Sequence, residues 1–437
     1  MICTTKNFTN KEETDVQTPF SWDNYSDQPY QLKDKNFKKQ MRKKESSSLM
    51  QTLLTSIFTI PLSLVSMPFI RRKEIKTEDF FSLGVDYQRE PQKTLEILDE
   101  LKIQRILVRF KLWEIDTLEE LKKFLLKNKK RKVILKILQD RENIEDTILL
   151  QNNLKKIFHT LDGLVEFYEI GSTINRAKWG FFSVREYNNF YKIAYKLQQE
   201  EFPHIKLMGS GVIDFEFHFT AHTLFNFENY KYDATSALLY VDRRGAPENT
   251  QLGFNLLDKI ALLSTMVWIS PKSKHELHIT ETNWPISNTA PYAPTSEYEC
   301  VDEKHYADYM LRYYLLALAS QQVNSLSWHQ LMARGYGLID NIDGIKKRKA
   351  FYVFKYMVKT LQNAQFLRLD IKRGYYILQF LVNDQLLQIH WALKEQTLQN
   401  EDFFIPYDMQ GNKLKKKQLP IGSSPLYIFI KNAEEQA

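Results

Sequence analysis

Three short apolar stretches decide the fold of this chain: RILVRF at Arg105–Phe110, KVILKIL at Lys132–Leu138 and VEFYEIG at Val165–Gly171. Short, largely apolar and partly β-branched runs of this kind are typical of strands that are buried on both faces of a parallel sheet. An amphipathic pattern over Leu118–Leu126 separates the first run from the second and predicts a helix. This part of the chain is therefore expected to form repeated βα units.

The same alternation extends in both directions along the chain. Further strands are predicted at Ser82–Tyr87, Lys206–Ser210, Thr235–Tyr240, Glu276–Glu281 and Leu326–His329. Further helices are predicted at Pro91–Leu101, Val184–Gln199, Leu256–Trp268, His305–Ala319 and Lys347–Leu361. Eight strand–helix pairs predict an α/β fold, a closed (β/α)8 TIM barrel over residues 78–364. No glycine-rich phosphate loop follows the first strand, which argues against a nucleotide-binding fold.

After Gln365 the pattern changes to strands separated by turns. Strands are predicted at Tyr375–Val382, Leu386–Trp391, Phe403–Tyr407 and Leu426–Ile430. Residues 365–437 are therefore expected to form a small antiparallel β-domain, similar to a β-sandwich.

Residues 1–77 precede the barrel and are basic. The first 48 are polar and turn-rich, so we expect them to be mostly disordered or loosely attached, and they contain no cleavable signal peptide. Leu49–Ile70 carries no charge and lies between Arg42-Lys43-Lys44 and Arg71-Arg72-Lys73. This segment is long enough to span a bilayer, but Pro61 and Pro68 argue against spanning, and it could equally lie on a membrane or pack on the barrel. The expected location is cytoplasmic or inner-membrane-associated.

Charge and cysteine content exclude several classes of function. The formal charge is +7, but the excess is concentrated in short runs such as Lys33–Lys44 and Lys127–Lys132, so nucleic acid is not an expected partner. The two cysteines, Cys3 and Cys300, form no CxxC motif. We therefore expect no disulfide framework, no metal and no cofactor.

In a barrel of this kind the active site lies at the carboxyl ends of the strands and in the loops that follow. Carboxylates, amides, arginines and aromatic residues gather at these positions, which is the mixture that a sugar-binding cleft requires. The candidate substrate-binding residues are Arg109, Asn175, Arg176, Trp179, Tyr240, Arg243, Asn283, Trp284, Trp328 and His329. Trp179, Trp284 and Trp328 are the candidate aromatic platforms, although each could instead fill a core.

Three segments resemble a known family. EIGSTIN at Glu169–Asn175 is similar to the strand-4 motif E-I-G-N-E-P-N of clan A glycoside hydrolases, the superfamily that includes β-xylosidases and α-L-iduronidases, and ITETNW at Ile279–Trp284 is similar to its strand-7 motif. The tail Tyr407–Asn412, followed by Ser424–Tyr427, is similar to the closing β-domain of several of these enzymes. The resemblance implies a carbohydrate substrate and Glu281 as the nucleophile.

The strand-4 motif departs from the family at two positions. Ser172 and Thr173 stand where the family has an Asn and the Glu that serves as general acid/base. A retaining glycosidase needs two carboxyl groups about 5 Å apart, and threonine cannot serve as the acid. Glu169 should point into the barrel, deeper along its strand, with a structural role. A displaced acid would come from Asp214, Glu216, Asp242 or Glu248, and a longer separation would predict inversion.

Two carbohydrate-related functions remain open from the sequence, and a barrel with unrelated chemistry is a third possibility, because this fold hosts many reactions. The first is a glycoside hydrolase or transglycosylase acting on a polysaccharide, with Glu281 as nucleophile or base and Asp242 and Glu216 as further catalytic candidates. Arg243-Arg244 and Arg176 point to an acidic glycan, although Asp242 and Glu248 could simply neutralise the arginine pair. The second is a non-catalytic glycan-binding barrel in envelope or capsular polysaccharide assembly, which the loss of the acid at Thr173 favours.

Overall fold

The computed structural model describes residues 20–70, 74–241 and 245–431. Its centre is a closed parallel barrel in the order β10-β3-β4-β5-β6-β7-β8-β9. The strands are β3 (Phe81–Val85), β4 (Arg105–Lys111), β5 (Lys132–Leu138), β6 (Phe167–Ile170), β7 (Leu207–Ile213), β8 (Ala234–Leu238), β9 (Leu277–Thr282) and β10 (Ser325–Trp328). The predicted (β/α)8 barrel is confirmed, and each of the eight predicted strands is present.

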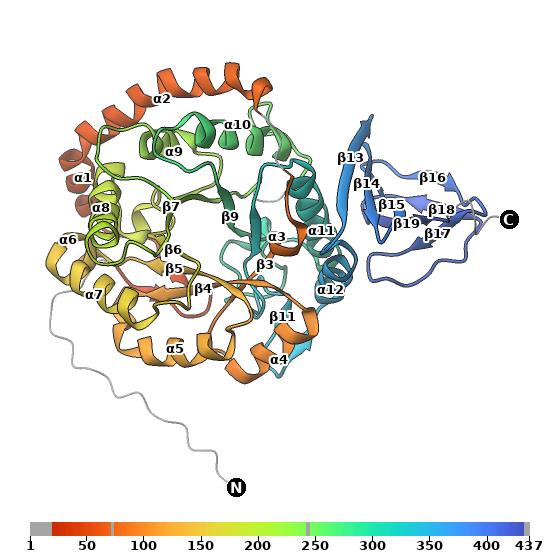
Figure 1. Ribbon diagram of the computed structural model, residues 1–437, viewed down its shortest axis with the longest axis horizontal. Helices are drawn as coiled ribbons and strands as arrows, with labels where there is room; N and C mark the ends of the chain where they lie inside the picture. Colours follow the sequence, from red (N-terminus) through yellow and green to blue (C-terminus); the bar gives the residue numbers. More distant parts are fainter. Residues whose placement is uncertain (1–19, 71–73, 242–244, 432–437) are drawn as a thin grey trace, which may run out of the picture.

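Helices surround the barrel (Figure 1). They are α3 (Thr77–Phe80), α4 (Pro91–Leu101), α5 (Leu118–Lys127), α6 (Arg141–Glu145), α7 (Thr147–Thr160), α8 (Val184–Glu200), α9 (Phe217–Leu224), α10 (Leu256–Ile269), α11 (Glu303–Ala319) and α12 (Lys349–Leu361). Short 3-10 turns η2 (Leu112–Thr117), η3 (Ala177–Trp179) and η4 (Glu297–Glu299) lie in the connecting loops, and the short strands β11 (Ile339–Asp340) and β12 (Lys346–Lys347) pair with each other.

Strand register arranges the barrel interior in layers. The apolar side chains of Leu107, Ile134 and Phe167 pack together inside the barrel, with Met208 and Ala234. Two residues further along β4, β5 and β6, Arg109, Lys136 and Glu169 lie side by side. Because side chains alternate along a strand, these three polar residues occupy the same inner face as the apolar layer. The barrel interior therefore changes from apolar to charged towards the carboxyl ends of the strands.

The predicted C-terminal antiparallel β-domain is confirmed. It contains a five-stranded sheet in the order β13-β14-β15-β19-β17 and a separate pair, β16 and β18. The strands are β13 (Gln365–Lys372), β14 (Tyr375–Val382), β15 (Gln385–Ala392), β16 (Gln396–Gln399), β17 (Phe404–Tyr407), β18 (Gln418–Ile421) and β19 (Leu426–Ile430). This domain lies beside α11 and α12 of the barrel (Figure 1).

The N-terminal region is ordered where the structure describes it, so the expectation of disorder is wrong for residues 20–48; residues 1–19 lie outside the described part. Strands β1 (Trp22–Asp23) and β2 (Gln28–Pro29) pair with each other, and α1 (Lys35–Lys44), α2 (Ser46–Ser66) and η1 (Met67–Phe69) follow. Helix α2 lies along the outside of α9 and α10 (Figure 1). Polar composition predicted disorder here because it indicates that a segment has little apolar core of its own. These residues are instead held against the barrel mainly by hydrogen bonds, ion pairs and aromatic contacts.

Candidate active site

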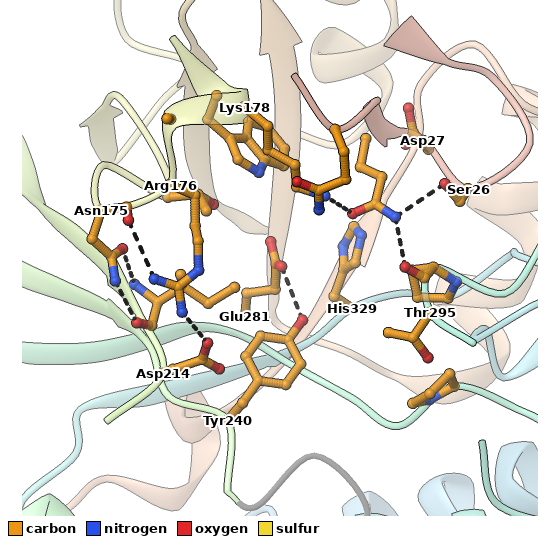
Figure 2. Close-up of a pocket in the computed structure, with 18 of the residues that line it drawn as sticks. Ser26, Asp27, Asn175, Arg176, Lys178, Asp214, Tyr240, Glu281, Thr295 and His329 are labelled. Carbon is orange, nitrogen blue, oxygen red and sulfur yellow. Dashed lines mark hydrogen bonds and ion pairs between the residues drawn. The ribbon is translucent and has the colours of Figure 1, made fainter. Parts of the chain in front are cut away.

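A cavity of about 580 Å³ opens at the carboxyl ends of the barrel strands (Figure 2). Eight of the thirteen residues predicted for the site line it: Arg109, Asn175, Arg176, Trp179, Tyr240, Glu281, Asn283 and His329. They come from strands and loops distributed around the barrel. Closing the barrel is what brings these residues into one pocket.

Glu281 lies near the end of β9, with its side chain only 13% exposed. Tyr240, just after β8, donates a hydrogen bond from its hydroxyl to Oε1 of Glu281 at 2.9 Å (Figure 2). On the other side, Nζ of Lys136 lies 3.5 Å from Oε2 of Glu281. Both carboxylate oxygens therefore have a polar partner, and the carboxylate has a defined orientation towards the pocket.

The charge state of Glu281 follows from these neighbours. Burial alone raises the pKa of the Glu281 carboxyl, but the positive charges of Lys136, His329 and Arg109 and the Tyr240 hydroxyl outweigh burial and lower this pKa to about 2. Burial and the adjacent carboxylate raise the pKa of Tyr240 well above its usual value, so its phenol keeps the proton that it donates. Glu281 is thus an anion across the physiological pH range and fits the role of nucleophile or base, not that of acid.

Lys136 also contacts the second buried carboxyl group of the barrel interior. Its Nζ lies 3.6 Å from Oε2 of Glu169, while Oε1 of Glu169 accepts a hydrogen bond from the Thr280 hydroxyl at 2.9 Å. Glu169 is completely buried, and burial raises its pKa, with Lys136 offsetting part of the effect. Glu169 does not line the pocket among the described residues, in agreement with the structural role predicted for it.

Arg109 and His329 form the opposite wall of the pocket. A guanidinium nitrogen of Arg109 lies 3.4 Å from Nε2 of His329, and the imidazole ring stacks on Tyr336 with ring centroids 5.3 Å apart. Burial lowers the pKa of His329 to about 4, so its imidazole is neutral at neutral pH. The main-chain carbonyl of His329 accepts a hydrogen bond from the Asn283 amide at 2.5 Å.

A strap formed by residues 20–32 closes one side of the pocket. Asp27 accepts a hydrogen bond from Arg109 on its carboxylate at 2.5 Å and another on its main-chain oxygen at 2.9 Å. Gln28 accepts from Lys178 at 2.6 Å and donates to the carbonyl of Pro294 at 2.9 Å. Ser26, Asp27 and Gln28 all line the cavity. The strap is therefore a wall of the site and was not predicted, because no pattern in residues 20–32 points to a barrel partner.

Arg176 lies after β6 and holds two of the predicted acids. Its guanidinium contacts Asp214 at 2.5 Å and Glu216 at 2.7 Å, and the Asn175 amide donates to Glu216 at 2.8 Å. Burial raises the pKa of Glu216, but Arg176 and Asn175 outweigh burial, so the pKa of Glu216 is lowered overall. Asp214 lines the cavity, whereas Glu216 does not. Arg176 is thus neutralised by two carboxylates, which removes one of the cations that suggested an acidic glycan.

Thr173 occupies the position where the resemblance implies an acid/base. It lines the cavity and is 2% exposed, and its hydroxyl lies 3.3 Å from that of Ser172. The loop after β6 therefore places a threonine at the pocket where the family resemblance requires a carboxyl group.

Two of the three predicted tryptophan platforms lie in the core. Trp284 and Trp328 are 2% and 0% exposed, and their indole rings stack on each other with centroids 5.9 Å apart. Nε1 of Trp328 donates to the Tyr306 hydroxyl at 2.8 Å. Neither ring lines the cavity, so the predicted platform role is wrong for both. Burying the two aromatic rings against each other is more favourable than exposing them to the pocket. Trp179 does line the cavity, edge-on to Trp22 of the strap.

The remaining predicted positions fall elsewhere. Asp242 and Arg243, with Arg244, lie outside the described residues. Glu248 is buried away from the cavity, where it accepts a hydrogen bond from Trp391 of β15 at 2.8 Å and lies 3.5 Å from Arg312 of α11. A role for Glu248 as the displaced acid is therefore wrong, because its carboxyl group joins the barrel to the C-terminal domain.

Lys136 and Tyr336 also belong to the site or its immediate surroundings, but the sequence did not predict them. The lysine in KVILKIL was a signal that could have been followed, since a cation inside a buried strand needs a buried anion. Within the described ranges, no group of three His, Cys, Asp or Glu side chains is arranged to hold a metal ion.

No protein-family model matches this sequence, and no curated protein matches it either. Solved structures do resemble the fold. A family 39 glycoside hydrolase from the gut symbiont Bacteroides cellulosilyticus WH2 is 14% identical, with 82% of each chain covered and a TM-score of 0.65. A family 39 β-xylosidase from Caulobacter crescentus is 13% identical, with 83% of this chain and 98% of that chain covered and a TM-score of 0.57. A family 30 endoxylanase from Clostridium papyrosolvens C71 is 10% identical, with 83% and 97% covered and a TM-score of 0.54.

The chain therefore shares the barrel and β-domain architecture of clan A glycoside hydrolases. The resemblance inferred from the three sequence segments is confirmed at the level of the fold. The likeness concerns the fold, and the chemistry depends on the residues that line the pocket.

Proposed function

We propose that this chain is a glycosidase, a hydrolase or transglycosylase acting on O-glycosidic bonds of a polysaccharide. The observation that carries the proposal is the ionised Glu281 carboxylate in a cavity of about 580 Å³, oriented by Tyr240 and Lys136. A carboxylate held in this way can attack an anomeric carbon or activate a water molecule. The shared fold with glycoside hydrolases supports the same reading.

Asp214 is the best remaining candidate for the acid. Of the four positions considered, it lines the cavity together with Glu281, whereas Glu216 and Glu248 do not, and Asp242 lies outside the described residues. Its carboxylate forms an ion pair with Arg176 at 2.5 Å, so the group that would have to donate the proton is already engaged by a cation. An enzyme with a weak acid works best on a leaving group that departs as a stable anion without being protonated, such as a phosphate.

We further propose that the substrate is acidic. Three cationic side chains, Lys38, Arg42 and Lys178, line the strap side of the cavity. Lys38 and Arg42 lie on α1, and Lys178 lies on η3. A phosphorylated or uronic glycan would find cations there. These three cations support an anionic substrate independently of Arg243.

A second candidate is a glycan-binding barrel without catalysis. The buried Thr173 hydroxyl at the end of β6 favours it, because that position supplies no acid. A role in envelope or capsular polysaccharide assembly, and a cytoplasmic or inner-membrane location, remain predictions.

The test is turnover of aryl glycosides and glycosyl phosphates by the wild type, Glu281→Gln and the surface control Glu119→Gln. Both substrate groups leave with little help from an acid, so they report a working nucleophile or base on its own. We expect Glu281→Gln to lose activity by about 1000-fold or more. Azide should restore part of this activity if Glu281 activates the attacking water. The activity of Glu119→Gln should be unchanged. Absence of turnover by the wild type, together with glycan binding that survives Glu281→Gln, would favour the binding barrel.

A further inference from the structure

Helix α2 has its polar and apolar faces reversed relative to a helix that packs on a soluble domain. The buried residues are Ser48, Thr52, Ser56, Thr59 and Ser63. Their spacing of three and four residues places them on one face. A helix packed on a water-soluble protein normally buries its apolar stripe and exposes its polar one, so this arrangement requires an explanation.

The buried hydroxyl groups are satisfied without water. Each hydroxyl from Thr52 to Ser63 donates to the main-chain oxygen four residues earlier, at 2.6–2.9 Å. Thr52 also contacts Nδ1 of His222 at 2.7 Å, and Ser56 donates to the carbonyl of His218 at 3.3 Å, both on α9. Small polar residues at a close helix contact are the arrangement that helices use when their other face is in lipid.

The opposite face of α2 is apolar and exposed. Its largest exposed side chains include Ile57 at 63%, Phe58 at 74% and Val65 at 70%, and Phe69 in η1 is 77% exposed. One candidate span, Ser46–Phe69, meets the length and composition of a membrane helix, and only 17% of its most apolar window is buried. A contiguous exposed apolar face of this length marks a binding surface.

The charges beside this face identify the kind of partner. Helix α1 leads directly into α2 and carries the exposed basic residues Lys35, Lys39, Arg42, Lys43 and Lys44, without an acidic residue. The sequence places Arg71-Arg72-Lys73 directly after the other end. A second copy of this chain docked on the same face would bring like charges together, whereas an anionic lipid surface would neutralise them.

We propose that α2 is a membrane-surface helix that lies in the headgroup region of an anionic bilayer. It does not cross the bilayer, because its Ser/Thr face is packed along α8, α9 and α10, and Glu45 at its start is paired with Arg185 of α8 at 3.0 Å. The apolar face inserts between the lipids, and the basic residues of α1 contact the headgroups. Lys38 and Arg42 of α1 also line the candidate active site, so membrane binding would hold the pocket beside the lipid surface.

The experiment is flotation of the purified full-length chain with phosphatidylcholine vesicles, with and without phosphatidylglycerol. Wild-type protein should float with the anionic vesicles and be released by high salt, since the headgroup contacts are screened. The double variant Ile57→Ser, Phe58→Ser should bind at least about tenfold more weakly, because it removes two inserting side chains. Ile148→Ser, at an equally exposed apolar residue of α7 (72%), is the matched control and should bind like the wild type.

A second variant tests the charges separately. Lys39→Gln, Lys43→Gln, Lys44→Gln should weaken binding to anionic vesicles by about tenfold or more and have little effect on phosphatidylcholine alone. Because every substituted side chain is exposed, the thermal unfolding of both variants should match that of the wild type. Three results would overturn the proposal: no binding to anionic vesicles, bound protein that resists extraction by both salt and alkaline carbonate as a spanning helix does, or a dimer in solution that Ile57→Ser, Phe58→Ser dissociates.

Discussion

Lys136 and Glu281 form a buried ion pair at the base of the candidate active site, with Nζ of Lys136 3.5 Å from Oε2 of Glu281. The same ammonium lies 3.6 Å from Glu169, so a single cation is placed between two carboxyl groups. Lys136 is completely buried, which means that its charge is balanced by these two groups rather than by water. The pair therefore links the stability of the barrel to the charge of its candidate nucleophile.

Replacing Lys136 by Met should raise the pKa of Glu281 from about 2 towards or above its ordinary value, because burial would then act without its main counter-charge. The free energy of unfolding should fall by about 3–5 kcal/mol, the typical cost of breaking a buried pair. Carbon-13 NMR titration of the carboxyl groups, assigned with Glu281→Gln, measures the first effect and urea denaturation the second. Lys132→Met, at an exposed position of the same strand, is the control. An unchanged pKa of Glu281 would show that Lys136 does not set its charge.

Replacing Tyr240 by Phe removes the hydroxyl that donates to Oε1 of Glu281 at 2.9 Å. The ring and its packing remain, so we expect the fold to be retained. If Glu281 is the nucleophile or base, kcat on aryl glycosides should fall by about 10- to 100-fold with a smaller change in KM. Tyr298→Phe, at a side chain that is 86% exposed, should have no effect. A loss confined to KM would indicate that Tyr240 only binds substrate.

Replacing Asp27 by Asn should loosen the strap from the pocket wall. Asp27 is held by Arg109 through its carboxylate, and burial of both groups makes the ion pair costly to break. Residues 20–32 should then exchange amide hydrogens about tenfold faster or more, while the barrel strands keep their protection. Hydrogen exchange followed by mass spectrometry measures the difference, with Asp116→Asn at an exposed site as the control. Equal exchange in both proteins would mean that other contacts hold the strap.

Glu248 should contribute to stability without contributing to catalysis. Its carboxyl group accepts from the indole of Trp391, and Arg312 lies 3.5 Å away, both fully buried. Glu248→Ala should lower the free energy of unfolding by about 3 kcal/mol, because a buried donor and a buried cation lose their partner. Glu248→Gln keeps an acceptor for Trp391 and should cost less. A change in the activity of Glu248→Gln, measured beside its thermal unfolding, would reinstate this residue as a catalytic candidate.

Stability should fall as the pH decreases from about 6.5 to 4. Burial lowers the pKa of His390 in β15 from its ordinary value of 6.5 to about 4, so in this range the unfolded chain binds a proton that the folded chain does not. The stabilisation is complete above pH 6.5 and decreases towards pH 4, by about 3 kcal/mol at most for this residue. Urea denaturation of the wild type and His390→Gln at several pH values measures it. Identical pH slopes would show that His390 is not the group responsible.

Much of the barrel could be predicted because its signal is local. A strand such as Lys132–Leu138 is recognisable from its own apolar residues, and the barrel rule then places the residues at strand ends in one pocket. Glu281, Arg109 and His329 were found in this way and do line one cavity. The resemblance of Ile279–Trp284 to a known motif added the role proposed for Glu281.

The strap could not be predicted, because its contacts are long-range. Asp27 and Arg109 are 82 residues apart, and neither the polar composition of residues 20–32 nor their spacing indicates a partner. The predicted platform role of two tryptophans was wrong for a related reason. Periodicity can place Trp284 and Trp328 near strand ends, but whether an indole faces the pocket or another indole depends on packing between neighbouring strands.

The sequence by itself determined the order of the strands and helices, the position of Glu281 at the end of a barrel strand, the hydroxyl in place of an acid at Thr173 and an uncharged segment at Leu49–Ile70. These are properties of single residues and short repeats. Only the tertiary structure decided that Lys136 faces Glu281, that Asp27 closes the pocket and that α2 turns a row of Ser and Thr side chains inwards and Ile57, Phe58 and Val65 outwards. The free energy of these arrangements comes from contacts between distant segments, and they exist only after the barrel has closed.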